Sequence, residues 1–245
     1  MGRAKRSLLV ESPFLVPKDE RPPLVLPLSV PLVAPEGFAA RLAAAGASVS
    51  DTTLTQLGDY LARLLAMNEQ MNLTAIKTPE DAWERHILDA LTLLPLLVEL
   101  PAGARILDVG SGGGLPGIPL AIARPDLSIT LLEATQKKAA FLTAVSAALE
   151  LSNITVRADR AEALVKSDLR SAFDVVTARA VARLVSLVPL TLPFAKPSGL
   201  VLLIKGQRAE DELEEASYIL EKQHTTHERT IATPTGRIVV LRRKA

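Results

Sequence analysis

An acidic residue followed by closely spaced glycines is the feature of this sequence with the clearest chemical meaning. The run reads Asp108, Val109, Gly110, Ser111, Gly112, Gly113 and Gly114. Glycine lets the backbone turn sharply and approach a ligand without obstruction by a side chain. The apolar residues 105–109 predict a strand before this turn, and residues 118–124 predict a helix after it. Open α/β sheets bind ligands at such junctions, beyond the carboxyl ends of the strands.

The spacing of the glycines separates two kinds of ligand. Dinucleotide-binding loops follow G-x-G-x-x-G, whereas this loop follows G-x-G-x-G and is preceded by the carboxylate of Asp108. A carboxylate repels a pyrophosphate, but it attracts the ammonium and sulfonium groups of S-adenosylmethionine. The Lys-Ser or Lys-Thr ending of a nucleoside-triphosphate loop is missing. The loop therefore predicts a site for S-adenosylmethionine formed by Asp108, Gly110, Ser111, Gly112 and Gly114.

Acidic residues after the next two predicted strands extend this site. Glu133 ends the predicted strand 127–133, close to the offset of roughly 20 residues at which an acid meets ribose hydroxyls. The third predicted strand, 154–157, is followed by the polar turn 159–162, which includes Ala161 and Glu162. That turn could meet the adenine amino group or could be an ordinary solvated turn, and its residues alone favour neither.

Alternating strand and helix patterns predict the scaffold that carries these loops. Further strands are expected at 173–177 and 200–205, further helices at 137–149 and 211–222, and a closing antiparallel pair at 226–231 and 237–241. Such alternation indicates βαβ units. The predicted fold is α/β: a Rossmann-like sheet of the class I S-adenosylmethionine-dependent methyltransferases, mostly parallel with an antiparallel C-terminal strand, and with helices on both faces.

Two segments precede this predicted core of residues 101–245. Residues 1–47 are rich in proline and predict a weakly ordered leader, more readily a dispensable extension than a binding segment. Residues 48–100 predict a helical region. Its first helix would begin at Ser50 or Asp51, and its second would be capped by Thr78, with a proline at the first helical position.

The composition excludes several classes of protein. The 245 residues include no cysteine and three histidines, and the formal net charge is +1. Disulfides, cysteine zinc sites and thiolate nucleophiles are therefore excluded, and no metal site is predicted. A near-zero charge means that nucleic acid would have to contact a local basic face. No apolar run reaches the roughly 20 residues that span a bilayer, and the start does not fit a signal peptide, which predicts a cytoplasmic protein.

Together with segments upstream, the predicted site resembles the RsmG (GidB) family of bacterial small-subunit rRNA methyltransferases, which act on guanine N7. The resemblance runs from about Leu54 to the C-terminus and says nothing about the leader. It implies S-adenosylmethionine as cofactor and 16S rRNA of the small ribosomal subunit as partner; we expect a monomer without a DNA or membrane partner. The matching segments are Asn68-x-x-x-Asn72-Leu73-Thr74, Arg85-His86-Ile87-Leu88-Asp89, Ile106 to Pro119, Ala178-Arg179-Ala180 and Ile204-Lys205-Gly206-Gln207.

The resemblance also implies a role for individual residues. The implied cofactor contacts are Gly110, Leu115, Glu133, Ala134, Thr135, Ala161, Glu162 and Arg179. The implied substrate side consists of Asn68, Asn72, Arg85, His86 and Lys205. The family often has an aromatic residue before the first asparagine, and here that position is Met67. Stacking of a base at this position is therefore not expected.

Methylation at guanine N7 agrees with what the sequence lacks. N7 carries an in-plane lone pair and no proton, so catalysis needs alignment and electrostatics rather than a general base. Accordingly, the fourth predicted strand is not followed by the Asn/Asp-Pro-Pro-aromatic motif of amino-group methyltransferases. Arg179 and Lys205 are the candidate catalytic residues, and either could donate to guanine O6 or hold phosphates.

Several alternatives stay open at this level. His86 fits a structural hydrogen bond as well as a substrate contact, and Asn68 and Asn72 could cap a helix or contact RNA. A small-molecule methyltransferase would have an enclosed, apolar substrate pocket, and a non-catalytic RNA-binding factor would bind no cofactor. An RNA enzyme needs a positive rim, for which the candidates are Lys137, Lys138, Arg157, Arg160, Arg179, Arg183, Lys205, Arg208, Arg242, Arg243 and Lys244.

Overall fold

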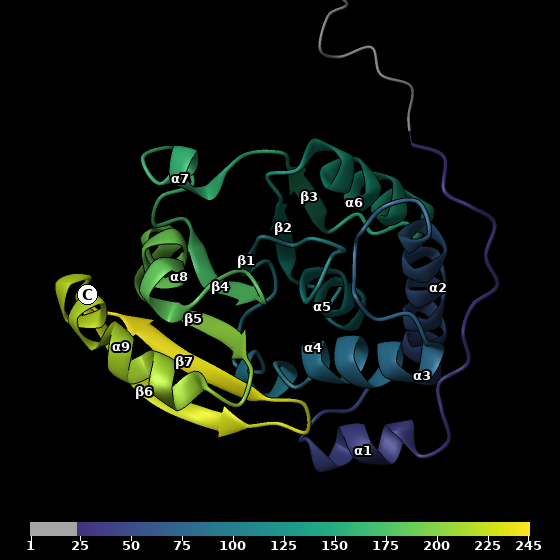
Figure 1. Cartoon of the computed structure of the whole chain (residues 1–245), viewed down its shortest axis with the longest axis horizontal. Helices are drawn as coiled ribbons and strands as arrows, with labels where there is room; N and C mark the ends of the chain where they lie inside the picture. Colours follow the sequence, from purple (N-terminus) through teal and green to yellow (C-terminus); the bar gives the residue numbers. More distant parts are fainter. Residues whose placement is uncertain (1–23) are drawn as a thin grey trace, which may run out of the picture.

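A seven-stranded sheet organises residues 24–245, which are the residues that the computed structural model describes (Figure 1). Its order is β3-β2-β1-β4-β5-β7-β6, with β1 to β5 parallel and β7 antiparallel to both of its neighbours. The predicted fold class is confirmed. The strands are β1 (Arg105–Val109), β2 (Ser128–Leu132), β3 (Ile154–Arg157), β4 (Phe173–Arg179), β5 (Ala195–Lys205), β6 (Thr225–Ala232) and β7 (Arg237–Arg243).

Helices cover both faces of this sheet (Figure 1). Successive side chains of a strand point to opposite faces, so Ile106 packs into the core under α2, α5 and α6, whereas Leu107 packs into the core under α8 and α9. Burial on both faces explains the nearly continuous apolar strands. The helices concerned are α2 (Asp51–Asn68), α5 (Gly117–Ala123), α6 (Gln136–Ala148), α7 (Ala161–Leu164), α8 (Leu184–Thr191) and α9 (Ala209–Lys222).

The helical region before the core begins where the sequence indicates. Ser50 caps α2 by accepting a hydrogen bond from the backbone N–H of Thr53, and Thr78 caps α3 (Pro79–Ala82) in the same way. Beyond α3 the chain forms a π-helical turn, Trp83–Leu88, then α4 (Asp89–Leu91) and a 3₁₀ turn at Leu94–Leu96. No helix within residues 24–245 is both long enough and apolar enough to cross a membrane.

The end of the predicted leader is ordered, contrary to expectation. Residues 38–44 form α1 (Phe38–Ala44), and Phe38 is 1% exposed, with its ring edge-on to Trp83 at 4.9 Å between centroids. Before α1 the extended chain passes along α2, where the Leu32 N–H donates to the Gly58 carbonyl at 3.1 Å (Figure 1). The prediction of a weakly ordered leader is therefore wrong for residues 38–44. Residues 1–23 of that leader lie outside the described residues.

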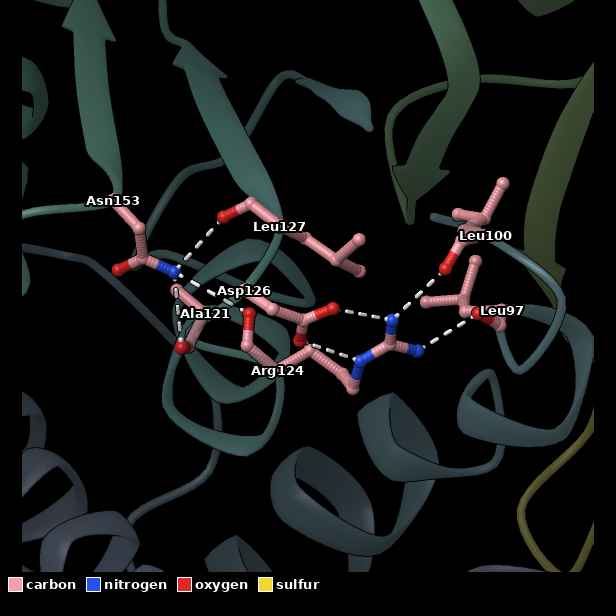
Figure 2. A network of polar contacts seen from close by, with 7 residues as sticks. All are labelled: Leu97, Leu100, Ala121, Arg124, Asp126, Leu127 and Asn153. Atoms are coloured by element: carbon pink, nitrogen blue, oxygen red, sulfur yellow. Dashed lines mark hydrogen bonds and ion pairs between the residues drawn. The ribbon is translucent and has the colours of Figure 1, made fainter. Parts of the chain in front are cut away.

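A polar network joins the helical region to the core at the amino ends of the strands (Figure 2). Arg124 follows α5 and donates to both carboxylate oxygens of Asp126 at 2.7 Å. The same guanidinium donates to the carbonyls of Leu97 and Leu100, which end the helical region. Asn153 donates to carbonyls on either side of this bend. The network lies at the amino ends of the strands, whereas the glycine loop lies at their carboxyl ends. It therefore fixes the scaffold without contacting the predicted site.

Candidate active site

A cleft of about 540 Å³ opens at the carboxyl ends of β1, β2 and β4. It lies where the topology of an open α/β sheet places a ligand. Residues from the glycine loop, from the end of each of these strands and from the helical region meet in its wall. The residues predicted from the sequence that line the cleft are Gly110, Ser111, Gly112, Leu115, Glu133, Ala134, Arg179, Arg85 and His86.

The glycine loop leaves the floor of the cleft free of side chains. Gly110 has φ +72°, and a Cβ there would lie 2.8 Å from a methyl carbon of Val181. Gly112 has φ +56°, and its N–H donates to Glu133 Oε2 at 2.9 Å. A side chain at Gly110 would collide with the neighbouring loop, whereas one at Gly112 would enter open space. The loop therefore exposes backbone to a ligand in the cleft.

Glu133 ties the glycine loop to the end of β2. One carboxylate oxygen accepts the Gly112 N–H, and the other accepts the Thr135 N–H at 2.7 Å. Each carboxylate oxygen has two acceptor positions, so one on each oxygen remains for the hydroxyls of a ribose. Because Glu133 also lines the cleft, it fits the predicted ribose contact.

Asp108 supports the cleft from below instead of lining it. The side chain is fully buried, and its two oxygens accept from the Gly117 N–H at the start of α5 and from the Thr177 hydroxyl on β4, both at 3.2 Å. Burial raises the pKa of Asp108 to about 6. Asp108 was predicted to attract a cationic ligand, but in the structure its carboxylate binds groups of the protein itself. It fastens the strand that carries the glycine loop to α5 and to β4.

His86 and Arg179 form a hydrogen-bonded pair on another wall of the cleft. Arg179 Nη2 lies 3.2 Å from His86 Nδ1 and 2.6 Å from the Arg85 carbonyl oxygen, to which it donates. Nδ1 also lies 3.1 Å from the Arg85 carbonyl oxygen, so it has an acceptor and a donor within reach and finds a partner in either tautomer. Nε2 lies 2.8 Å from the Thr74 hydroxyl. Of the two alternatives for His86, the structural hydrogen bond is present, and the ring lines the cleft as well.

The pH dependence of folding should reveal this buried histidine. Burial, with a smaller contribution from Arg179, lowers the pKa of His86 from 6.5 to about 4. Between pH 6.5 and 4 the unfolded state binds a proton at His86 that the folded state does not bind. The contribution of His86 to the free energy of unfolding is therefore complete above pH 6.5 and is lost as the pH falls to 4. At 1.36 kcal/mol per pKa unit, the loss is about 3 kcal/mol.

The comparison protein is His86→Gln, whose amide can donate to or accept from the Thr74 hydroxyl in place of Nε2. Urea unfolding between pH 6.5 and 4 should show a shallower decline in unfolding free energy for this variant than for the parent. Other groups that titrate in this range are common to both proteins. Equal slopes would show that His86 does not titrate as described.

Some predicted site residues are not in the cleft lining. Asn68 Oδ1 accepts from the N–H groups of Leu73 and Thr74, so it holds the loop after α2 and does not cap the helix end, whose unpaired groups are carbonyls. Lys205 forms an ion pair with Glu212 at 2.8 Å and donates to the Ala182 carbonyl, so its ammonium is already used. The structure does not bring Lys205 to the cleft. The other predicted residues outside the lining are Asp108, Asn72, Gly114, Thr135, Ala161 and Glu162.

Other cleft residues were not assigned to the site from the sequence. Thr74 and Ile76 lie after α2, and Thr74 accepts from the Ile76 N–H as well as facing His86. The signal for Thr74 was its place in the Asn-Leu-Thr segment. Val181 follows β4 and reaches Gly110, and no pattern in the sequence marks it. Lys138 also lines the cleft, and it was expected only in the positive rim.

Charge around the cleft is mostly positive. Arg85, Lys138 and Arg179 line it, against one carboxylate, that of Glu133. Further out, several members of the predicted rim have acidic partners within the described chain: Arg157 with Asp159, Arg183 with Glu215, Arg208 with Asp211 and Arg242 with Glu228. Of the three cations in the lining, Arg179 is paired with Asp89, whereas Arg85 and Lys138 form no ion pair within residues 24–245.

Solved structures with the same arrangement are known. The ribosomal protein L11 methylase from Lactobacillus delbrueckii subsp. bulgaricus superposes with a TM-score of 0.52 at 16% identity, over 66% of this chain and 79% of that one. A SAM-dependent methyltransferase from Aquifex aeolicus gives 0.52 at 16% identity, over 67% and 93%. With the strand order and the glycine loop, the fold is the Rossmann-like fold of class I methyltransferases.

Sequence relatives narrow this class. The family model GidB, described as rRNA small subunit methyltransferase G, matches residues 53–238. The protein of that name in Sorangium cellulosum is 66% identical over 228 residues, 93% of this chain and 95% of that protein. Its namesake in Lachnoclostridium phytofermentans is 41% identical over 185 residues, 75% and 76% of the two chains. The chain belongs to the GidB family of rRNA methyltransferases, as the resemblance in its motifs predicts.

Proposed function

We propose that this protein transfers a methyl group from S-adenosylmethionine to N7 of a guanosine in 16S rRNA of the small ribosomal subunit. We further propose that it acts in the cytoplasm as a monomer. The rRNA substrate rests on family membership. The choice of N7 rests on the side chains of the cleft.

The cleft has the features that S-adenosylmethionine requires. Bound there, S-adenosylmethionine supplies a methyl group on a positively charged sulfur. The backbone of Gly110 and Gly112 offers close approach, and Glu133 offers acceptors to ribose hydroxyls. Thr135, Ala161 and Glu162 lie outside the cleft lining, so their proposed contacts with the cofactor rest on the resemblance to the family.

The assignment of N7 rests on one observation: both side chains that could act as a general base already hold hydrogen bonds within the protein. Within residues 24–245, the cleft lining offers two side chains that could accept a proton, Glu133 and His86. Glu133 holds the N–H groups of Gly112 and Thr135, and His86 has Arg179 at one ring nitrogen and Thr74 at the other. The low pKa of His86 also makes it a weak base. N7 of guanine attacks through a lone pair and releases no proton, so it needs neither side chain.

The charge of the cleft favours RNA over a neutral small molecule. Three of its four charged lining side chains are cationic, among them Arg85, which is exposed at its mouth. Phosphate contacts of this kind make binding fall steeply with salt. Met67 is fully buried in α2, so the proposed contacts with RNA involve charge and hydrogen bonds more than stacking at that position.

A methylation assay tests the proposal. The full chain is incubated with radiolabelled S-adenosylmethionine and small ribosomal subunits, or with naked 16S rRNA, and labelled nucleosides are identified by mass. We expect label as N7-methylguanosine at one site, with initial rates that fall as salt rises. Label at another atom would contradict N7. No label in rRNA, from a protein that still binds the cofactor, would contradict the substrate.

A further inference from the structure

Asp89 joins three parts of the chain beside the cleft. It is the first residue of α4, directly after the π-helical turn. One carboxylate oxygen accepts from Arg179 Nε at 3.1 Å, at the end of β4, and the other accepts from the hydroxyl of Thr235, in the turn between β6 and β7. The side chains of Asp89 and Arg179 are 7% and 16% exposed, so solvent screens this ion pair little.

The guanidinium of Arg179 is thereby held at two of its three nitrogens. Nε faces Asp89, and Nη2 donates to the Arg85 carbonyl. Among the residues that the structure describes, Nη1 is buried and has no hydrogen-bond partner. A buried donor without a partner is costly, and native proteins usually satisfy such a group by a water or a ligand. The side chain lines the same cleft as Gly110 and Ser111.

We propose that Asp89 is a positioning residue, which holds Arg179 so that its remaining donors bind the carboxylate of the methionine part of S-adenosylmethionine. This inference rests on the proposed cofactor. That cofactor has one anionic group, and a charge-assisted hydrogen bond from Nη1 to a carboxylate depends on the orientation of the planar guanidinium. A planar donor released from Asp89 would lose this orientation, although the positive charge would remain.

Two adenosine ligands separate this role from a merely structural one. S-adenosylhomocysteine carries the amino-acid carboxylate, whereas 5′-methylthioadenosine keeps the adenosine and the thioether but has no carboxylate. In the proposed function, Glu133 and the glycine loop bind the part that both ligands share. A change at Asp89 that acts through Arg179 should therefore weaken only the ligand with the carboxylate.

Isothermal titration of the full chain supplies the test. In Asp89→Asn we expect the affinity for S-adenosylhomocysteine to fall about 10- to 100-fold, the range for a hydrogen bond to a charged group, with the affinity for 5′-methylthioadenosine unchanged. Thr235→Val keeps both charges and should give a smaller change of the same kind. In Arg179→Ala, adding Asp89→Asn should have little further effect, because the two act as a unit.

Asp126→Asn is the matched control, because it also removes a carboxylate from an arginine ion pair, at the opposite edge of the sheet. It should leave both affinities unchanged. Equal weakening of both ligands in Asp89→Asn and Thr235→Val, or no weakening of either, would overturn the proposal. Failure of the parent to bind S-adenosylhomocysteine would overturn it together with the cofactor assignment. Failure to methylate rRNA, with the binding difference intact, would overturn only the proposed function.

Discussion

Replacing Gly112 by aspartate is expected to abolish binding of S-adenosylmethionine and to leave the fold intact. The backbone at this position has φ +56°, a conformation that aspartate tolerates better than most residues. A Cβ here has only the Gly110 carbonyl oxygen within 4 Å, so the side chain has space. That space belongs to the cleft, and the new carboxylate would lie beside Glu133, whose oxygen accepts the Gly112 N–H.

We expect a loss of affinity of at least about 100-fold, equivalent to about 3 kcal/mol, because the ligand would meet both a side chain and a second negative charge. Calorimetric titration measures the affinity, and circular dichroism confirms the fold. Gly103→Asp is the matched control: it has φ +80° and open space, but it precedes β1 at the opposite edge of the sheet. Unchanged affinity in Gly112→Asp would show that the cofactor lies elsewhere.

Phe38→Ala should lower the free energy of unfolding by about 3–5 kcal/mol, the range for removal of a buried aromatic side chain. Phe38 is 1% exposed, and its ring packs edge-on against Trp83, which is itself fully buried. The substitution leaves a cavity between α1 and the π-helical turn. Trp83 is the only tryptophan of the chain, so its fluorescence follows unfolding in denaturant and reports on this contact directly.

The control for this substitution is Val33→Ala. Val33 is 90% exposed and lies in the extended chain just before α1, so its truncation should change stability by less than about 0.5 kcal/mol. If Phe38→Ala were as mild as Val33→Ala, α1 would not be part of the folded core, and the sequence-based expectation of a dispensable segment would hold there after all.

Much of the fold could be predicted because burial on both sides of a sheet leaves a plain pattern. The strand 154–157 and the caps at Ser50 and Thr78 have the expected positions. Helix α8 (Leu184–Thr191) was not predicted, because it is apolar on nearly all sides and contains Pro189. Helix α1 was hidden among prolines, and its apolar residues bury against Trp83 from a distant segment, which no local pattern can show.

The candidate site was predictable where a residue type is dictated by the backbone or by chemistry, as at Gly110, Gly112 and Glu133. It was not predictable where partners come together only through the fold. Asp108 was expected to face the ligand, but its strand register places it opposite Thr177. Lys205 is at the carboxyl end of β5, the end of the sheet at which the cleft lies, but its ammonium forms an ion pair with Glu212.

The order of the strands also constrains how the chain can reach this structure. β7 lies between β5 and β6, so it is inserted between two strands that are synthesised before it. Until then β5 is an open sheet edge with apolar side chains such as Leu202 and Leu203, the kind of surface on which chains aggregate. Thr235 lies in the turn that joins β6 to β7. The hydrogen bond that supports Asp89, and through it Arg179, can therefore form only after the β6–β7 hairpin has been synthesised.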